Sequence, residues 1–121
     1  MPEKKGNNRY DDGKNAISKD KPFEDKKRVD TVCDLRLDKY FDITGRALEK
    51  VKAAEKDSGR GKEAADFLDM AERYYSDAKH FREQGNYVLA LAAVNYAHAW
   101  LDAGARIRLF KVSDSELFAA D

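Results

Sequence analysis

Residues 74–104 read YYSDAKHFREQGNYVLALAAVNYAHAWLDAG, and this stretch decides the fold. It holds the end of one helix, a tight turn at Gly85-Asn86 and a helix built mostly from alanine and aromatic residues. Glycine readily adopts the left-handed conformation that ends many helices, and asparagine is a favoured N-cap. So short a connection makes the two helices antiparallel. The sequence therefore predicts a helical hairpin whose second helix covers residues 87–110.

The helix expected over residues 87–110 is apolar around about two thirds of its circumference. Such a helix must be covered on more than one side. Tyr87 and the face formed by residues 94–105 are the expected packing contacts. Two neighbouring helices would not cover all of the apolar surface of this helix. Either a homodimer or a helical protein partner covers the excess, or the alanines are simply half exposed.

Two amphipathic helices are expected before this one, over residues 61–84 and from about residue 27 to the loop at 56–62. Apolar side chains recur in both at alternating spacings of three and four, as on one face of a helix. In the first helix these residues are Cys33, Leu37, Tyr40, Thr44, Ala47, Val51 and Ala54. Cys33 is accordingly predicted to be a buried structural thiol. Gly45 indicates a kink or a close contact with a neighbouring helix.

The chain is predicted to be all-α, an up-down-up three-helix bundle over residues 27–112. Residues 1–26 are polar and of mixed charge, which predicts a disordered N-terminal tail. Residues 113–116 read SDSE, a capping-box pattern ahead of Leu117 and Phe118. Residues 113–121 are therefore expected to form a C-terminal tail or a short helical turn that folds back on the bundle.

Composition narrows the class of protein. Of the 121 residues 38% are charged, yet the formal net charge is zero, so no global field favours nucleic acid, and no nucleic-acid partner is predicted. No apolar run approaches the roughly 18 residues that span a bilayer, and no secretory signal is recognisable. The single cysteine allows no intrachain disulfide and suits a reducing compartment. These features predict a cytoplasmic protein without a membrane partner.

Three motifs carry a family resemblance. They are YYSDA at residues 74–78, GNY at 85–87 and NYAHAWLDAG at 95–104. With them, residues 28–112 resemble the archaeal family known as domain of unknown function 357. The resemblance implies a small three-helix bundle. It implies no activity, because the family has none assigned.

One narrow polar stripe crosses the otherwise apolar helix 87–110. It consists of Asn95, His98, Asp102 and Arg106. Asp77 and His80 lie on the neighbouring antiparallel helix, so Asp77, His80, Asn95, His98 and Asp102 form a candidate polar site for a ligand or a metal ion. The alternative is that the stripe faces solvent, or that its members satisfy one another between helices. The spacing matches no strong metal motif, and neither a metal ion nor a cofactor is predicted.

Arg73 and His80 have an R-x6-H spacing, which is similar to that of helical ribonucleases of the HEPN class. Residues seven apart share a helix face. However, Tyr74 stands where those enzymes usually carry a polar residue. The alternative function is therefore an RNA-directed or metal-assisted hydrolase using Arg73, His80, His98 and Asp102.

An acidic ridge is expected on the first helix, formed by Asp30, Asp34, Asp38 and Asp42. It would either dock a basic partner or be a solvated face compensated by Lys27, Arg36, Lys39 and Arg46. No catalytic signature is present, and no residue is assigned as catalytic. The favoured function is a non-catalytic protein-interaction or assembly module.

Overall fold

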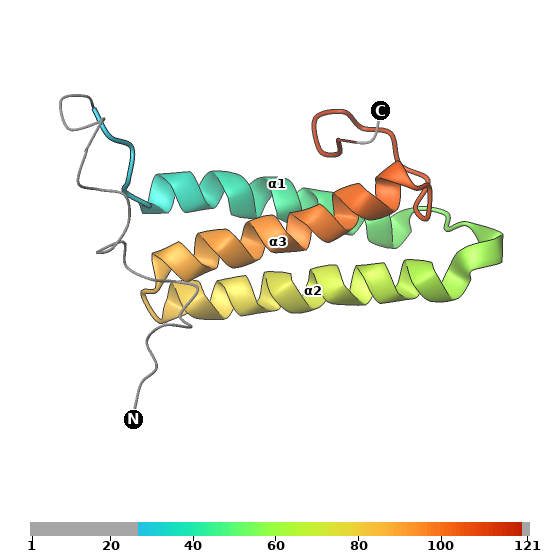
Figure 1. The fold of residues 1–121 in the computed structure, drawn as a ribbon, viewed down its shortest axis with the longest axis horizontal. Coiled ribbons are helices and arrows are strands. Elements are labelled where there is room, and N and C mark those ends of the chain that lie inside the picture. Colours follow the sequence, from blue (N-terminus) through green and yellow to red (C-terminus); the bar gives the residue numbers. More distant parts are fainter. Residues whose placement is uncertain (1–26, 120–121) are drawn as a thin grey trace, which may run out of the picture. The chain divides into compact units, whose positions relative to one another are not determined.

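The computed structural model describes residues 27–119, of which residues 32–119 form a three-helix bundle (Figure 1). The helices are α1 (Asp34–Ala53), α2 (Gly61–Glu83) and α3 (Tyr87–Arg106), with the short 3-10 turn η3 (Ser58–Arg60) ahead of α2. Consecutive helices run antiparallel, and the described residues contain no strand. The predicted all-α bundle is confirmed, whereas the tail predicted over residues 1–26 lies outside the described residues.

No helix within residues 27–119 combines the length and the apolar character that crossing a bilayer requires.

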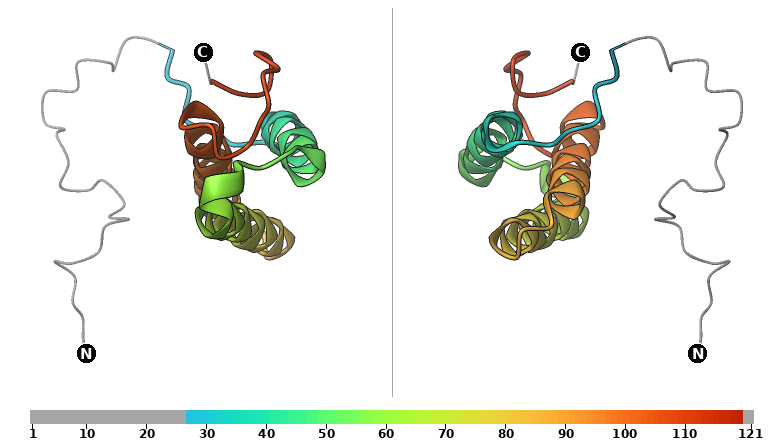
Figure 2. Two further views of the ribbon diagram at one scale, coloured as in Figure 1. Left: turned by 90° about the vertical axis from the view of Figure 1, so that its right-hand side faces the viewer. Right: turned by 90° about the vertical axis from the view of Figure 1, so that its left-hand side faces the viewer.

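α3 is the central helix of the bundle. It packs against both α1 and α2, most extensively against α2, while α1 and α2 contact each other least. Seen end-on, the three helices occupy the corners of a triangle (Figure 2). The buried residues of α3 are mostly small: Ala90, Ala93, Val94, Ala97, Leu101, Gly104 and Ala105. Small side chains let the neighbouring helices approach closely, as the alanine-rich sequence predicts.

The turn between α2 and α3 has the expected caps. Gly85 has a φ of 82°, and its N–H donates to the Arg82 carbonyl at 2.9 Å. The N–H of Asn86 donates to the Phe81 carbonyl at 2.9 Å, which completes a Schellman motif. The side chain of Asn86 also accepts from the Leu89 N–H at 3.1 Å and thereby caps α3. Asn86 therefore closes one helix and opens the next.

α1 begins at Asp34, so the expected start near residue 27 is wrong. Cys33 is the N-cap and is exposed, which corrects its assignment as a buried thiol. The end of α2 and the start of α3 lie beside the first residue of α1. This is shown by the bonds from Arg82 and Tyr87 to Asp34, at 3.0 and 2.6 Å. A thiol one residue before the helix therefore has no neighbouring helix to cover it.

α1 continues unbroken through Gly45, which marks a close contact with α2. A Cβ at this position would lie 2.7 Å from the hydroxyl oxygen of Tyr75. That hydroxyl donates to the Phe41 carbonyl at 3.2 Å. Of the two explanations offered for Gly45, the close contact is confirmed.

α3 ends before residue 110, the end expected from its apolar pattern. Arg108 takes the left-handed conformation, with a φ of 64°. The N–H of Leu109 donates to the Gly104 carbonyl at 2.8 Å, and that of Arg108 to the Ala105 carbonyl at 3.1 Å. This is a second Schellman motif, with arginine in place of the usual glycine. The end of α3 was mispredicted because arginine, rather than the usual glycine, occupies the left-handed position after the helix.

The chain then crosses to the connection between α1 and α2. Leu109 and Phe110 are buried in the core, 0% and 1% exposed. The N–H of Asp57 donates to the Leu109 carbonyl at 3.0 Å, and that of Lys111 to the Glu55 carbonyl at 2.9 Å. These bonds tie the end of α3 to the connection between the first two helices.

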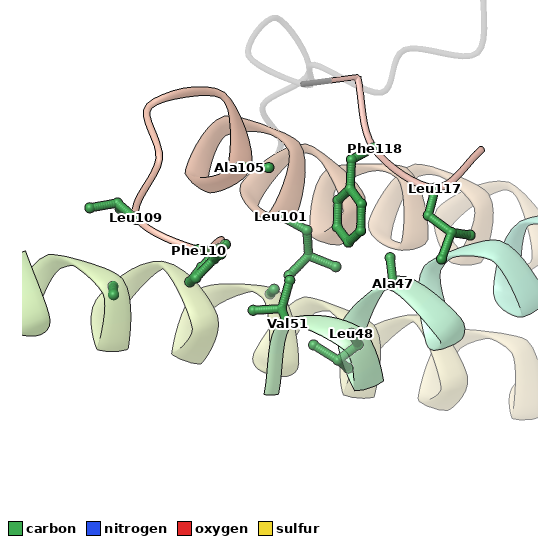
Figure 3. Close-up of a cluster of buried hydrophobic side chains, with 11 residues drawn as sticks. Ala47, Leu48, Val51, Leu101, Ala105, Leu109, Phe110, Leu117 and Phe118 are labelled. Atoms are coloured by element: carbon green, nitrogen blue, oxygen red, sulfur yellow. The ribbon is translucent and has the colours of Figure 1, made fainter. Parts of the chain in front are cut away.

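Residues 112–119, called the C-terminal segment below, return along α1 and α3 (Figure 1). The N–H groups of Leu117 and Phe118 donate to the Asp114 carbonyl at 3.1 and 2.9 Å, which forms the expected turn. Its cap is the Asp114 side chain, which accepts from the Glu116 N–H at 2.9 Å, rather than Ser113. Both apolar side chains are only 3% exposed and point toward Leu101 of α3 and Ala47 of α1 (Figure 3).

Candidate functional site

The polar stripe of α3 contains one well-defined site, centred on His98. The Nδ1 of His98 lies 3.0 Å from the Oγ1 of Thr44 on α1, and its Nε2 lies 2.8 Å from the carbonyl oxygen of Leu117. Asp102, one helical turn further along α3, lies 3.5 Å from the same Nε2 and accepts from the Ala119 N–H at 3.0 Å. Three parts of the chain therefore meet here: α1, α3 and the C-terminal segment.

The partners of His98 decide its hydrogen-bonding roles. A carbonyl oxygen only accepts, so the Nε2 of His98 carries a hydrogen and donates it to Leu117. In a neutral ring the Nδ1 then accepts from the hydroxyl of Thr44. Thr44 is 2% exposed and is the one polar residue among those buried within residues 27–119. A buried hydroxyl needs a partner, and His98 supplies it.

The five residues of the predicted polar site do not all converge. His98 and Asp102 lie together, and their side chains are 18% and 30% exposed. Asn95 is exposed on α3, and Asp77 and His80 are exposed on α2. None of these three hydrogen-bonds to the His98–Asp102 pair. The partners of the pair are Thr44 and the backbone of the C-terminal segment, neither of which belongs to the predicted polar site.

The rotation of α3 explains this arrangement. Its aromatic side faces α2: Tyr96 packs edge-on against Tyr74 with ring centroids 4.4 Å apart, and Trp100 against Phe67 at 5.0 Å. The polar stripe is therefore turned away from α2, and His98 points toward α1. A lone polar residue on the apolar stripe of α1, namely Thr44, was the sequence signal that could have revealed this contact.

Arg73 lies on the exposed side of α2. Its Nε donates to the Asp69 carboxylate at 2.8 Å, and this bond, with the charges of Asp69 and Asp77, raises the pKa of Arg73. Arg73 and Asp77 line an open groove of about 800 Å³, together with Tyr74 and Met70. Acidic side chains dominate this groove, and Arg73 is its one cation.

The four residues of the hydrolase alternative lie on two separate surfaces. Arg73 and His80 are exposed on α2. His98 and Asp102 bind α1 and the C-terminal segment. In the part of the chain that the structure describes, no group of three or more His, Cys, Asp or Glu side chains is placed to hold a metal ion.

A second polar cluster joins the ends of all three helices. The Nη2 of Arg82 on α2 donates to Asp34 and Asp38 of α1 at 3.0 and 2.7 Å. The hydroxyl of Tyr87 on α3 donates to Asp34 at 2.6 Å. The Tyr87 bond and then the Arg82 bond hold the pKa of Asp34 below its usual range, and the bond to Asp34 raises the pKa of Tyr87.

This cluster accounts for much of the predicted acidic ridge. Asp30 precedes α1 and is not part of the helix. Asp34 and Asp38 are paired with α2, and Asp42 pairs with Arg46 at 3.2 Å. Of the compensating cations expected from the sequence, Arg46 is in place. The sequence did not reveal Arg82 as a partner of the ridge. Its contact with Asp34 and Asp38 depends on the C-terminal end of α2 lying beside the N-terminal end of α1.

A third feature is an apolar stripe that remains exposed on α3. Its large members are Val88 and Tyr96 on α3 and Ile107 at its C-cap, which are 67%, 48% and 47% exposed. The α3 stripe is completed by three exposed alanines and consists of Val88, Ala92, Tyr96, Ala99, Ala103 and Ile107. These residues are spaced 4-4-3-4-4, which places them on one side of the helix. This is the surplus surface that the sequence predicts for a helix with two neighbours.

Comparison with known proteins finds one family. Residues 39–110 match the model of a family described as "Protein of unknown function (DUF357)". No curated protein and no solved structure matches the chain. The matched region includes Thr44, His98 and Asp102 and stops before the C-terminal segment that His98 and Asp102 bind.

Proposed function

The chain belongs to the DUF357 family, whose function is unknown, and we propose that it is a non-catalytic module that assembles with a second copy of itself. The observation that carries this proposal is the α3 stripe. Contiguous exposed apolar surface marks interaction sites, whereas single exposed apolar residues need no explanation. The stripe extends over 20 residues of the chain, which is about 30 Å of helix.

The pattern of the stripe favours a second copy as the partner. Its spacing reads the same in both directions, with a centre between residues 97 and 98. A two-fold contact requires such a pattern, because each surface must be complementary to itself. When two copies of α3 pack antiparallel about this centre, Ala92 comes level with the partner's Ala103. Small residues at these levels allow close approach, and the helix dipoles oppose each other favourably.

The oligomeric state tests the proposal. We expect the protein to sediment as a dimer at high concentration, and Ala99→Glu to shift it to monomer because the charge would be buried at the contact. Ala65→Glu is the matched control, since Ala65 is exposed on α2. Circular dichroism should show unchanged helix content in both variants. A wild-type protein that stays monomeric at every concentration would overturn self-assembly.

Disulfide cross-linking tests the antiparallel register. In a Cys33→Ser background, Ala92→Cys and Ala103→Cys chains mixed together should form a cross-linked dimer, because the two positions lie level. Neither variant alone should do so. Antiparallel copies would separate identical positions by about 16 Å along the helix, beyond the roughly 4.4–6.8 Å between Cα atoms in disulfides. Efficient cross-linking of Ala92→Cys by itself would indicate a parallel pair instead.

We place this module in the cytoplasm. Cys33 is the single cysteine and it is exposed, an arrangement that suits a reducing compartment. Trapping thiols at the moment of lysis should find Cys33 reduced. A substantial disulfide-linked fraction in intact cells would contradict this assignment.

A further inference from the structure

The contacts of the C-terminal segment resemble those of a bound peptide. His98 donates to the carbonyl of residue 117, and Asp102 accepts from the N–H of residue 119. These backbone groups flank Phe118. His98 and Asp102 therefore hydrogen-bond to the main chain on either side of the Phe118 side chain. Main-chain hydrogen bonds give a peptide contact affinity, and buried side chains give it specificity.

The side chains supply the apolar part of the contact. Leu117 and Phe118 are each 3% exposed and belong to the same core cluster as Ala47 and Leu101 (Figure 3). Within residues 112–119 no other side chain is buried, and the half-buried Val112 packs against the same cluster at the start of the segment. The recognition element is therefore a Leu-Phe pair whose flanking main-chain groups are bonded to His98 and Asp102.

The C-terminal segment is joined to the bundle by few polar contacts. Among the described residues, the segment also forms an ion pair between Asp114 and Lys50 of α1, at 3.4 Å. The preceding residues differ, because Lys111 is bonded through its backbone to the α1–α2 connection. The chain is thus anchored up to Lys111 and held mainly by the Leu-Phe pair after it.

We propose that Thr44, Ala47, His98, Leu101 and Asp102 form a peptide-binding site, and that its resident ligand is the chain's own C-terminal segment. The segment detaches and rebinds as a unit while the three helices stay folded. Once it is detached, the site binds a Leu-Phe peptide supplied by a separate molecule. The site stands apart from the α3 stripe, so its existence does not depend on self-assembly.

The test uses the chain of residues 1–121 carrying Leu117→Asp and Phe118→Asp together. These two charges in the apolar site release the segment. The probe is a fluorescein-labelled peptide, SDSELFAAD, the sequence of residues 113–121. We expect the released variant to keep its helical circular dichroism and to bind the peptide in a fluorescence anisotropy titration. Wild type should bind at least tenfold more weakly, because its own segment occupies the site.

Further substitutions in the released variant identify the site. His98→Ala and Asp102→Ala should each weaken peptide binding at least tenfold, whereas the matched changes His80→Ala and Asp77→Ala on α2 should leave it unchanged. Asp102→Ala keeps the test decisive if His98→Ala fails to fold, since the Asp102 side chain is 30% exposed. Loss of helix in the released variant, absence of binding, or binding indifferent to Asp102→Ala would each overturn the proposal.

Discussion

At the scale of single residues, the two Schellman motifs differ in one side chain. Gly85 occupies the left-handed position after α2, and Arg108 occupies the same position after α3. Left-handed backbone costs a residue with a side chain about 1–2 kcal/mol, and glycine avoids this cost. The arginine is held there because the buried Leu109 and Phe110 that follow require the chain to turn at this point.

Arg108→Gly should therefore stabilise the protein. Relief of the left-handed strain exceeds the roughly 0.5–1 kcal/mol that glycine loses through its freer unfolded chain. We expect the free energy of unfolding, measured by urea titration, to rise by about 0.5–1 kcal/mol. The reverse change, Gly85→Ala, should lower it. A less stable Arg108→Gly variant would show that the arginine side chain contributes more than its backbone conformation costs.

At the scale of elements, the ends of the helices are determined by different chemistry. Lys56 closes α1: its Nζ donates to the carbonyls of Val51 and Ala54 at 2.7 Å each, and to that of Lys52 at 3.0 Å. A single ammonium group thus bonds three carbonyls at the end of α1, of which that of Val51 also accepts from the Ala54 N–H at 3.2 Å. No glycine is needed at this helix end, which lies shortly before the loop predicted at residues 56–62.

The packing of α3 on the segment that follows it depends on Gly104. A Cβ at this position would lie 2.2 Å from the Cε2 of Phe110, whose ring is 1% exposed. Displacing a buried ring costs about 1–3 kcal/mol, partly offset by the roughly 1 kcal/mol gain in helix propensity over glycine. We therefore expect Gly104→Ala to lower the free energy of unfolding by up to about 2 kcal/mol.

Gly61→Ala is the control for this change, because Gly61 begins α2 and a Cβ there would meet no atom within 4 Å. Thermal and urea unfolding of both variants should show a loss of stability for Gly104→Ala only. Equal effects at the two positions would mean that the Phe110 ring moves aside without cost.

At the scale of the whole molecule, the Asp34–Arg82–Tyr87 cluster links all three helices and makes stability depend on pH. Hydrogen bonds from Tyr87 and Arg82 hold the pKa of Asp34 below its usual range. A carboxylate whose pKa is lowered by folding stabilises the protein above its unfolded pKa of about 3.9, and this contribution is lost as the pH falls through the lowered pKa. The cluster therefore stabilises the bundle at neutral pH and fails in acid.

Asp34→Asn should accordingly be less stable than wild type at pH 7. The difference should shrink as the pH falls below the unfolded pKa of about 3.9 and through the lowered pKa of folded Asp34, where both chains carry a neutral side chain. Urea titrations at pH 7 and pH 3 measure it. Tyr87→Phe removes only the first of the hydrogen bonds and should show a smaller difference with the same pH dependence. A difference that is equal at both pH values would contradict the role of the cluster.

Much of the architecture could be predicted because its causes are local. The alternating spacings of three and four identified three helices, and Gly85 and Asn86 identified the turn between two of them. The prediction that Cys33 is buried within the first helix was wrong. An apolar period does not show where the neighbouring helices end and stop covering it. The end of α3 was missed because Arg108 occupies a conformation that usually signals glycine.

The amino-acid sequence by itself determined the all-α class, the central position of the alanine-rich helix and the surplus apolar stripe on it, since periodicity, cap chemistry and side-chain size are properties of neighbouring residues. Only the tertiary structure decided that His98 faces Thr44 and the C-terminal segment rather than His80 and Asp77. That choice depends on how α3 is rotated between its neighbours. The rotation is set by packing summed over the whole bundle, so no single motif reveals it.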